Sequence, residues 1–399
     1  MMNDIKQLQS LTTRERTRQV SVGGVLVGGG APIPVQSMTN TRTEDAQATL
    51  SQIRALADAG CDIVRCAVPT AEAAAALAEI TALSPIPVVA DIQFDYRLAL
   101  ASIRAGAAKI RINPGNIGGA RRVAEIAEAA GNAGIPIRIG VNGGSLEKEL
   151  LAKHGGVTAV ALAESAIHQV ELLHGMGFYD LVVSVKSSDV GMNLAAHRLL
   201  AERTDHPLHI GITEAGVLQA ALVKSAVGIG ALLCDGIGDT VRVSLTGDPV
   251  REIAAAQDIL RATGLLPGAI ELISCPTCGR TKTDLAAAAE RIAAAIAPIE
   301  KERIRNARQR DGSGGLGTKP PEPSLWHTAV PPEPSPWRAL TVAVMGCAVN
   351  GPGEAAHADA GVAFGDGRAV LFRKGEQVGT VPADQATEAL LEIVRELSM

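Results

Sequence analysis

Short apolar runs alternate with longer Ala-rich stretches between residues 32 and 245 of the chain. The runs are VQSM at 35–38, IVRCAV at 63–68, PVVADI at 87–92, KIRINP at 109–114, IRIGVN at 137–142, LVVSVK at 181–186, LHIGIT at 208–213 and TVRVSL at 240–245. Their length and their β-branched residues are typical of buried parallel strands. The stretches between them, such as 44–60 and 164–177, repeat apolar residues at three- and four-residue steps and end in glycine, which predicts helices.

Eight strand-and-helix repeats over about 240 residues predict an α/β protein with a TIM (β/α)8 barrel, which we assign to residues 1–270. An open, doubly wound sheet is the alternative. It is disfavoured because no GxGxxG sequence follows the first strand, and because polar residues end nearly every strand instead of gathering at one switch point.

The remaining residues, 271–399, predict a second and smaller α/β domain. The elements expected there are the helix after Cys278, strands at 341–346, 361–365 and 368–373, and a final helix near 383–398. The segment 311–337 is rich in proline, glycine and serine, which cannot bury enough apolar area to offset the ordering of the chain. We therefore expect an insertion over 305–338 that loops out on the surface.

Composition and charge exclude several classes of protein. The 399 residues are 47% hydrophobic and carry a net charge of −5, and the basic runs at 14–18 and 301–310 lack interleaved aromatic residues, which argues against nucleic-acid binding. Neither an apolar leader nor a membrane-length apolar stretch is present, so a cytoplasmic protein is expected. In that reducing compartment, the six cysteines favour metal or redox chemistry over disulfides.

Polar side chains end most of the predicted barrel strands, and strand ends meet at the mouth of a TIM barrel. These residues are Arg65, Asp91, Arg111, Asn113, Arg138, Asn142, Ser184, Lys186, Thr213, Glu214, Arg242 and Ser244. Five of them are cations, whose convergence would be costly without an anion of matching charge, so a ligand with at least two phosphate charges is expected. The alternative is that each arginine pairs with a barrel carboxylate, for which Asp91, Glu147, Glu214 and Asp239 are available.

The cysteines of the second domain indicate a metal centre. Cys275 and Cys278 form a C-x-x-C pair in CPTCGR, and Cys347 lies in MGCAVNGPGE. A zinc site would need a further ligand such as His357, whereas three cysteines favour an iron–sulfur cubane with one unusual corner. Glu354 is a candidate oxygen ligand that a substrate oxygen could displace, although it could also be an ordinary carboxylate at a helix start.

The other three cysteines lie in apolar contexts. We expect Cys61, Cys66 and Cys234 to be small buried hydrophobic residues.

The motifs together closely resemble one enzyme family, the 4-hydroxy-3-methylbut-2-enyl diphosphate synthases of the non-mevalonate isoprenoid pathway. The matching segments are VQSMTNTRTEDAQAT, KIRINPGNIG, IRIGVNGGSLEKEL, SVKSSDV, GITEAG, GIGDTVRVSL, CPTCGR and MGCAVNGPGE. The resemblance spans nearly the whole chain. It implies a TIM barrel followed by a small, sulfite-reductase-like [4Fe-4S] domain, in a homodimer whose cluster domains close over the partner's barrel.

The same resemblance implies the reaction and the roles of residues. The family opens the ring of 2-C-methyl-D-erythritol 2,4-cyclodiphosphate and removes a hydroxyl reductively, with two electrons from ferredoxin or flavodoxin. The implied cluster ligands are Cys275, Cys278, Cys347 and Glu354. The implied diphosphate contacts are Arg65, Arg111, Arg138, Lys186 and Arg242; Asp91, Asn113, Asn142, Glu214 and Ser244 would surround the carbon skeleton, and Asn350 would lie near the open iron.

Two departures from the family pattern stand out. The usual ADIHFDY reads ADIQFDY here, so Gln93 replaces a histidine and any proton-donating role of that histidine is in doubt. The stretch between Cys278 and Cys347 is also longer than usual, because it holds the proline-rich insertion. Two other interpretations remain: a barrel methyltransferase of the pterin or corrinoid kind, and a zinc-stabilised interaction module with an inert barrel.

Overall fold

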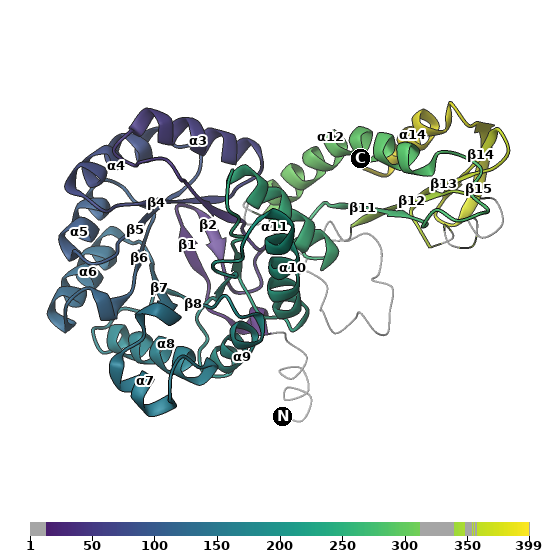
Figure 1. Ribbon diagram of the computed structural model, residues 1–399. Helices are drawn as coiled ribbons and strands as arrows, with labels where there is room; N and C mark the ends of the chain where they lie inside the picture. Colours follow the sequence, from purple (N-terminus) through teal and green to yellow (C-terminus); the bar gives the residue numbers. More distant parts are fainter. Residues whose placement is uncertain (1–12, 312–338, 348–352, 354, 356, 399) are drawn as a thin grey trace, which may run out of the picture. The chain divides into compact units, whose positions relative to one another are not determined.

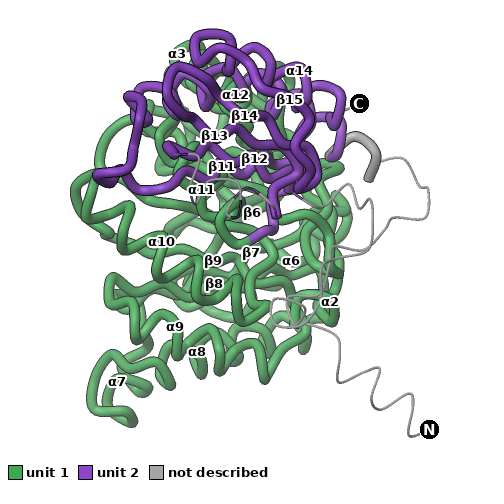
Figure 2. Tube along the Cα trace, turned by 90° about the vertical axis from the view of Figure 1, so that its right-hand side faces the viewer, with its two compact units in different colours: residues 1–263, 322–328 green, residues 264–321, 329–399 purple. Residues whose placement is uncertain are grey.

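A computed structural model of the chain describes residues 13–311, 339–347, 353, 355 and 357–398. The chain divides into two compact units (Figure 2): along the described residues, unit 1 runs to Thr263 and unit 2 begins at Gly264. This division lies upstream of the 270/271 boundary expected from the sequence. Gly264 has a φ of 66°, the left-handed conformation with which glycine ends a helix, and it directly follows the last helix of the barrel.

Parallel strands line the inside of unit 1 (Figure 1). They are β3 (Gln36–Met38), β4 (Ile63–Ala67), β5 (Val88–Asp91), β6 (Lys109–Ile112), β7 (Ile137–Asn142), β8 (Leu181–Lys186), β9 (His209–Ile210) and β10 (Thr240–Val241). Strands β3 to β8 form one sheet in sequence order, and β9 pairs with β10. Single bridges from Val183 to Leu208 and from Val35 to Val241 close the ring. The predicted barrel and its eight strands are confirmed.

Helices follow the strands and form the outer layer of the barrel (Figure 1). They are α3 (Ala46–Asp58), α4 (Ala71–Leu83), α5 (Tyr96–Arg104), α6 (Ala120–Ala133), α7 (Lys148–His154), α8 (Ala159–His174), α9 (Val190–Ala201), α10 (Leu218–Cys234) and α11 (Val250–Ala262), after a short α2 (Thr13–Arg16). Several begin at a side chain that accepts a backbone N–H of the first turn, as Asp45, Thr158 and Asp189 do. Such caps fix where each loop ends.

A β-hairpin that the sequence patterns did not predict closes one end of the barrel. Its strands are β1 (Val20–Val22) and β2 (Val25–Val27), and Val22 and Val27 are fully buried. They pack against Ile63, Val89 and Val182, which lie at or near the beginnings of their strands. The hairpin therefore forms an apolar floor at the end of the barrel opposite the strand ends.

Unit 2 is a mixed five-stranded sheet with helices on one face. Its strand order is β11 (Ile270–Ser274), β12 (Leu340–Met345), β13 (Ala360–Phe364), β14 (Arg368–Arg373) and β15 (Glu376–Pro382). Strands β11, β12 and β13 pair in parallel, whereas β14 pairs antiparallel with both β13 and β15. The helices are α12 (Leu285–Asp311) and α14 (Ala386–Ser398). The predicted strands and helices are confirmed, whereas β11 and β15 were not predicted. Residues 305–311 of the expected insertion continue α12, and 312–338 lie outside the described residues.

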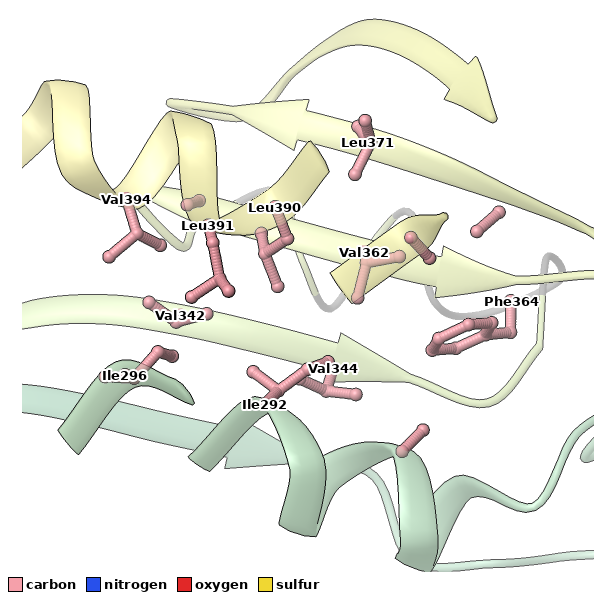
Figure 3. Close-up of a cluster of buried hydrophobic side chains, with 14 of the residues drawn as sticks. Ile292, Ile296, Val342, Val344, Val362, Phe364, Leu371, Leu390, Leu391 and Val394 are labelled. Carbon is pink, nitrogen blue, oxygen red and sulfur yellow. The ribbon is translucent and has the colours of Figure 1, made fainter. Parts of the chain in front are cut away.

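A cluster of buried apolar side chains fills the space between this sheet and the helices α12 and α14 (Figure 3). Ile292 and Ile296 of α12 and Leu390 and Val394 of α14 are at most 4% exposed. They pack on β12, β13 and β14 through side chains such as Val342 and Val362. Burial of this aliphatic face holds unit 2 together, and the other face of β12 bears Ala343 and Met345 in a separate small cluster.

Candidate active site

Several of the residues predicted at strand ends gather inside the barrel of unit 1, although Arg138 is the second residue of β7 and not at its end. Arg111 of β6 pairs in register with Asp91 of β5 and with Arg138 of β7, so the three side chains share one face of the sheet. Arg65 and Arg242 act electrostatically on the same group of side chains. The sequence expectation that cations converge here is met by these residues.

Asp91 is shared by two arginines. Its carboxylate lies 3.1 Å from Arg111 Nη1 and 3.5 Å from Arg65 Nε, and it is 4% exposed. Burial alone would raise the pKa of Asp91, but Arg65, Arg111 and Arg138 outweigh burial and hold that pKa below its ordinary value. Asp91 is therefore ionised at neutral pH, and its single charge offsets only part of the charge around it.

Arg242 has a partner that the sequence did not reveal. Glu252 of α11 is 4% exposed, and its Oε2 lies 3.6 Å from Arg242 Nε. The same carboxylate accepts hydrogen bonds from Ser37 Oγ at 2.8 Å and from the Leu245 backbone N–H at 3.1 Å. Glu252 was missed because it lies on a helix and not at a strand end. Of the carboxylates named as possible arginine partners, Asp239 instead accepts from Thr17 and from the Leu208 N–H.

Arg138 is the least satisfied of the predicted cations. It is 1% exposed, and neither its Nε nor its Nη1 has a hydrogen-bond partner in the described part of the chain. Burial and the neighbouring Arg65 and Arg111 lower the pKa of Arg138. Burial and Arg242 likewise lower the pKa of Lys186. Both pKa shifts have the same cause, which is that the surroundings of Arg138 and Lys186 do not stabilise their positive charges.

Two inward-facing glycines make room for the cationic groups. A Cβ at Gly140 would lie 2.5 Å from Arg111 Nε, and a Cβ at Gly211 would meet the backbone oxygen of Arg242 first and would lie 2.9 Å from Lys186 Nζ. Gly140 is two residues from Arg138 on β7, so it faces the interior as well. The missing side chains let Arg111 and Lys186 extend across their neighbouring strands.

The amide and hydroxyl residues lie around these cations. Asn113 is 5% exposed; its Nδ2 donates to Ser145 Oγ at 3.0 Å, and its Oδ1 accepts from the Gly115 N–H at 3.1 Å. Asn142 and Ser244 are half-buried at their strand ends. Gln93, which follows β5, is exposed. Neutral donors and acceptors at Asn113, Asn142 and Ser244 thus follow Arg111, Arg138 and Arg242 by two to four residues along the chain.

Glu214 follows β9 and is exposed. Its backbone has a φ of 51°, in the left-handed region that residues other than glycine seldom adopt. Such conformations occur at functional sites, where the surrounding structure enforces them. The sequence did not predict this feature.

The charges in the barrel do not balance. Among the described residues, the interior and its wall hold six cations against the carboxylates Asp91 and Glu252; the cations are the buried Arg65, Lys109, Arg111, Arg138 and Lys186 and the half-buried Arg242. The buried Asp239 is not counted, because it interacts with the buried Arg14. Lys109 was not among the predicted residues, because it begins its strand. An excess of buried positive charge on this scale is suited to an anionic ligand with several negative charges.

In unit 2, the parallel pairing of β11 and β12 brings two of the candidate cysteines to the same edge of the sheet. Ser274 pairs with Val344, Cys275 comes next on one strand, and Cys347 follows the end of the other. The backbone N–H of Gly346 donates to Cys275 Sγ at 3.2 Å. An N–H directed at sulfur is the contact that stabilises a cysteine thiolate in a cluster site.

Cys278 lies in the exposed loop after β11. Hydrogen bonds from Arg280, backbone first and then side chain, lower the pKa of the Cys278 thiol. A thiol with a lowered pKa is a better metal ligand, because metals bind the thiolate. Its neighbourhood fits the predicted role.

The remaining cysteines differ among themselves. Burial raises the pKa of Cys61 to about 12 and that of Cys66 to about 11, so both are inert core residues as expected. The expectation that Cys234 is buried is wrong: it is exposed, because it ends α10.

Asn350 and Glu354 lie outside the described residues. Within the described ranges, no three His, Cys, Asp or Glu side chains are close enough to hold a metal ion. Three of the four proposed cluster ligands, Cys275, Cys278 and Cys347, are among the described residues. Cysteine thiolates are the usual ligands of iron–sulfur clusters, so these residues fit such a group.

Comparison with known proteins gives the family. The model of the GcpE TIM-barrel domain matches residues 17–257, and that of the GcpE protein C-terminal domain matches residues 330–396. The chain belongs to the GcpE family. No helix in the described part of this GcpE-family chain has the length and apolar character of a membrane span.

Its relatives are similar along nearly their whole length. A 4-hydroxy-3-methylbut-2-en-1-yl diphosphate synthase (flavodoxin) from Geobacter sulfurreducens is 50% identical over 96% of this chain and 98% of its own. Enzymes of the same name from Caldanaerobacter subterraneus and Bacillus subtilis are 48% and 46% identical over 96% of this chain, and over 98% and 92% of their own chains. Among solved structures, a Yersinia pestis dihydropteroate synthase is 16% identical and covers 61% of this chain and 98% of its own, with a TM-score of 0.46.

Proposed function

We propose that this protein reduces 2-C-methyl-D-erythritol 2,4-cyclodiphosphate to 4-hydroxy-3-methylbut-2-enyl diphosphate. The reaction breaks the C–O bond that closes the cyclodiphosphate ring and a second C–O bond to a hydroxyl, which leaves as water. Two electrons and two protons balance it. The single observation that carries the proposal is the excess of buried, incompletely paired cations in the barrel of a GcpE-family chain.

The barrel residues bind and orient the substrate. Arg65, Arg111, Arg138, Lys186 and Arg242 hold the diphosphate, since guanidinium groups match phosphate oxygens and here lack enough carboxylates of their own. Asp91 keeps Arg65 and Arg111 at fixed positions. Asn113, Asn142 and Ser244 offer hydrogen bonds to the carbon skeleton, and Glu214 supplies a carboxylate beside the substrate for proton transfer.

Unit 2 carries the redox centre. Cys275, Cys278, Cys347 and Glu354 would hold a [4Fe-4S] cluster, which supplies single electrons to the substrate when it is bound. Asn350 would lie near the iron that the glutamate ligates. Flavodoxin is the proposed electron donor, because the relatives are named as flavodoxin-dependent synthases, and ferredoxin is the second candidate.

The first test is an anaerobic assay of the purified, cluster-loaded protein with the cyclodiphosphate and reduced flavodoxin. We expect a brown protein, about four irons per chain, and formation of the hydroxylated butenyl diphosphate. A colourless protein that contains zinc and forms no product would instead support the interaction module. A brown protein that forms no product would contradict the proposed substrate and would still support the proposed cluster.

A second test addresses the proposed homodimer, in which the cluster of one subunit serves the barrel of its partner. Arg138→Met and Cys347→Ala are each expected to be inactive, and they are co-expressed with different tags so that mixed dimers can be isolated. A mixed dimer then has one intact barrel opposite one intact cluster, and we expect about half of the wild-type turnover per dimer. No turnover in mixed dimers would mean that each subunit uses its own cluster.

A further inference from the structure

Beneath the predicted cations, the barrel holds a second group of buried polar side chains. Lys109 begins β6 and is 0% exposed, and its Nζ has no hydrogen-bond partner among the described residues. His209 begins β9, is also 0% exposed, and has no partner at either ring nitrogen within the same residues. None of the expected substrate contacts includes these two residues.

The position of Lys109 follows from strand register. It is two residues before Arg111 on β6, so both side chains face the barrel interior. It pairs with Val89 of β5, which packs against the β1–β2 hairpin. Lys109 therefore begins at the apolar floor, and its side chain can extend only within the barrel.

Among the described residues, the charged groups that act on Lys109 are cations. Arg138 of β7 and Arg65 of β4 are the charged groups that act on its amine, and both disfavour a second positive charge. His209 is surrounded in the same way, by Arg138, Lys186, Lys109 and Arg65. Burial, followed by these cations, lowers the pKa of both groups well below the ordinary values.

A buried amine with no acceptor and only cationic neighbours is unfavourable for the stability of the fold. A methionine of similar length would fill the same space without that cost. The amine becomes favourable only when an acceptor with negative charge enters the barrel.

We propose that Lys109 is a further ligand-binding residue, placed below the ring of arginines, which takes up one proton from solvent when the anionic substrate enters. The amine nitrogen gains an N–H bond, and the resulting ammonium donates to an oxygen of the ligand. This inference rests on the proposed function for the identity of the ligand. Binding of the anion and protonation of Lys109 then stabilise each other.

The test is isothermal titration of the anaerobic, cluster-loaded protein with the cyclodiphosphate, in two non-phosphate buffers whose ionisation enthalpies differ. The difference in heat between buffers gives the protons taken up per ligand bound. We expect Lys109→Met to take up about one proton fewer than the wild type and to bind about ten- to a hundredfold more weakly. Arg121→Met is the matched control, since its side chain is 89% exposed, and it should match the wild type in both quantities.

Thermal unfolding separates a binding role from a structural one. Lys109→Met without ligand should unfold at the same or a higher temperature than the wild type, because it removes an unsatisfied buried amine. If Lys109→Met does not fold, Lys109→Arg takes its place in the titration. The guanidinium of Lys109→Arg stays protonated with or without ligand, so this variant should take up about one proton fewer than the wild type when the ligand binds. Wild-type affinity and wild-type proton uptake in either folded variant would overturn the proposal.

The proposal can also be separated from the proposed function. If the wild type does not bind the cyclodiphosphate, the titration is repeated with inorganic pyrophosphate. Proton-linked binding of pyrophosphate that Lys109→Met weakens would support the role of Lys109 and reject the substrate. Binding of neither anion would overturn both.

Discussion

The barrel interior of unit 1 and the helix-covered face of the sheet in unit 2 are equally buried but differ in what they bury. In unit 2, residues such as Ile292, Val344 and Leu390 bring only apolar atoms to the contact. In unit 1, the interior brings Arg138 and Lys109, which retain unpartnered nitrogens in the described part of the chain. One region is complete without a ligand, and the other is not.

This difference separates stability from function. The aliphatic face of unit 2 gains free energy from burial alone. The barrel interior loses stability through its excess of cations, and the hairpin floor and outer helices must compensate. A substitution that removes a positive charge from the barrel should therefore cost binding and not stability, whereas a truncation in unit 2 should do the reverse.

The largest expected effect comes from the cluster ligands. Cys347→Ala should lose iron and have no measurable turnover with reduced flavodoxin, since three cysteine ligands are the minimum for the proposed centre. Binding of the cyclodiphosphate to the barrel should persist. Iron analysis and calorimetry on anaerobic protein measure both, and exposed Cys234→Ala is the control that should keep its iron. Full iron content in Cys347→Ala would remove that residue from the site.

Asp91→Asn tests the one carboxylate that two arginines share. Breaking a buried ion pair typically costs about 3–5 kcal/mol, and we expect a loss of that size in the free energy of unfolding of unit 1. Because the fold lowers the pKa of Asp91 below 3.8, the stabilisation is present above that pH and is lost as the pH falls through the lowered pKa.

The control for Asp91 is an exposed ion pair. Asp235 lies 2.7 Å from Arg198, but both side chains are largely exposed, so Asp235→Asn should cost less than about 1 kcal/mol. Denaturant unfolding followed by circular dichroism measures both variants. Equal losses for the two would contradict the importance that we assign to the buried pair.

Leu390→Ala tests the apolar face of unit 2. Removal of a buried leucine side chain should lower the free energy of unfolding of that unit by about 2–5 kcal/mol. The affinity of the barrel for the cyclodiphosphate should not change. Val378→Ala, at a residue that is 52% exposed, is the control. A weakened affinity in Leu390→Ala would show that the two regions are not independent in the way described.

The smallest effect is expected from Gly140→Ala. Its new Cβ would lie 2.5 Å from Arg111 Nε, so the guanidinium must shift, and we expect affinity for the cyclodiphosphate to fall by about tenfold. Gly131→Ala is the control, because its Cβ meets only Phe178 at an ordinary 3.9 Å. Equal affinities for both variants would mean that the placement of Arg111 does not matter to the ligand.

The sequence predicted the parts of the fold that follow a regular pattern. All eight barrel strands carry apolar runs, and the polar residues within these runs identified Arg65, Arg111 and Arg138. The expectation that Arg138 ends its strand is wrong, because it is the second residue of β7. The β1–β2 hairpin was missed because its strands are only three residues long. The edge strand β15 was missed because it is mostly exposed and contains glycine and proline.

Two residues of the site could not be found by looking at strand ends. Glu252 reaches the barrel from a helix, and Lys109 begins its strand, so contacts across the fold were needed to place both. An inward-facing glycine in a strand, such as Gly140, could have indicated that a long side chain from the neighbouring strand lies against it. In the structure, the guanidinium of Arg111 occupies the space beside Gly140.

The most direct measurement is the dissociation constant of the cyclodiphosphate for Arg138→Met compared with the wild type, by calorimetry on anaerobic protein. Arg138 is buried and has two nitrogens without partners in the described chain, so its removal should cost two charge-assisted hydrogen bonds. We predict affinity at least about a hundredfold weaker, in a variant that folds as stably as the wild type. Wild-type affinity in a folded Arg138→Met protein would contradict the account.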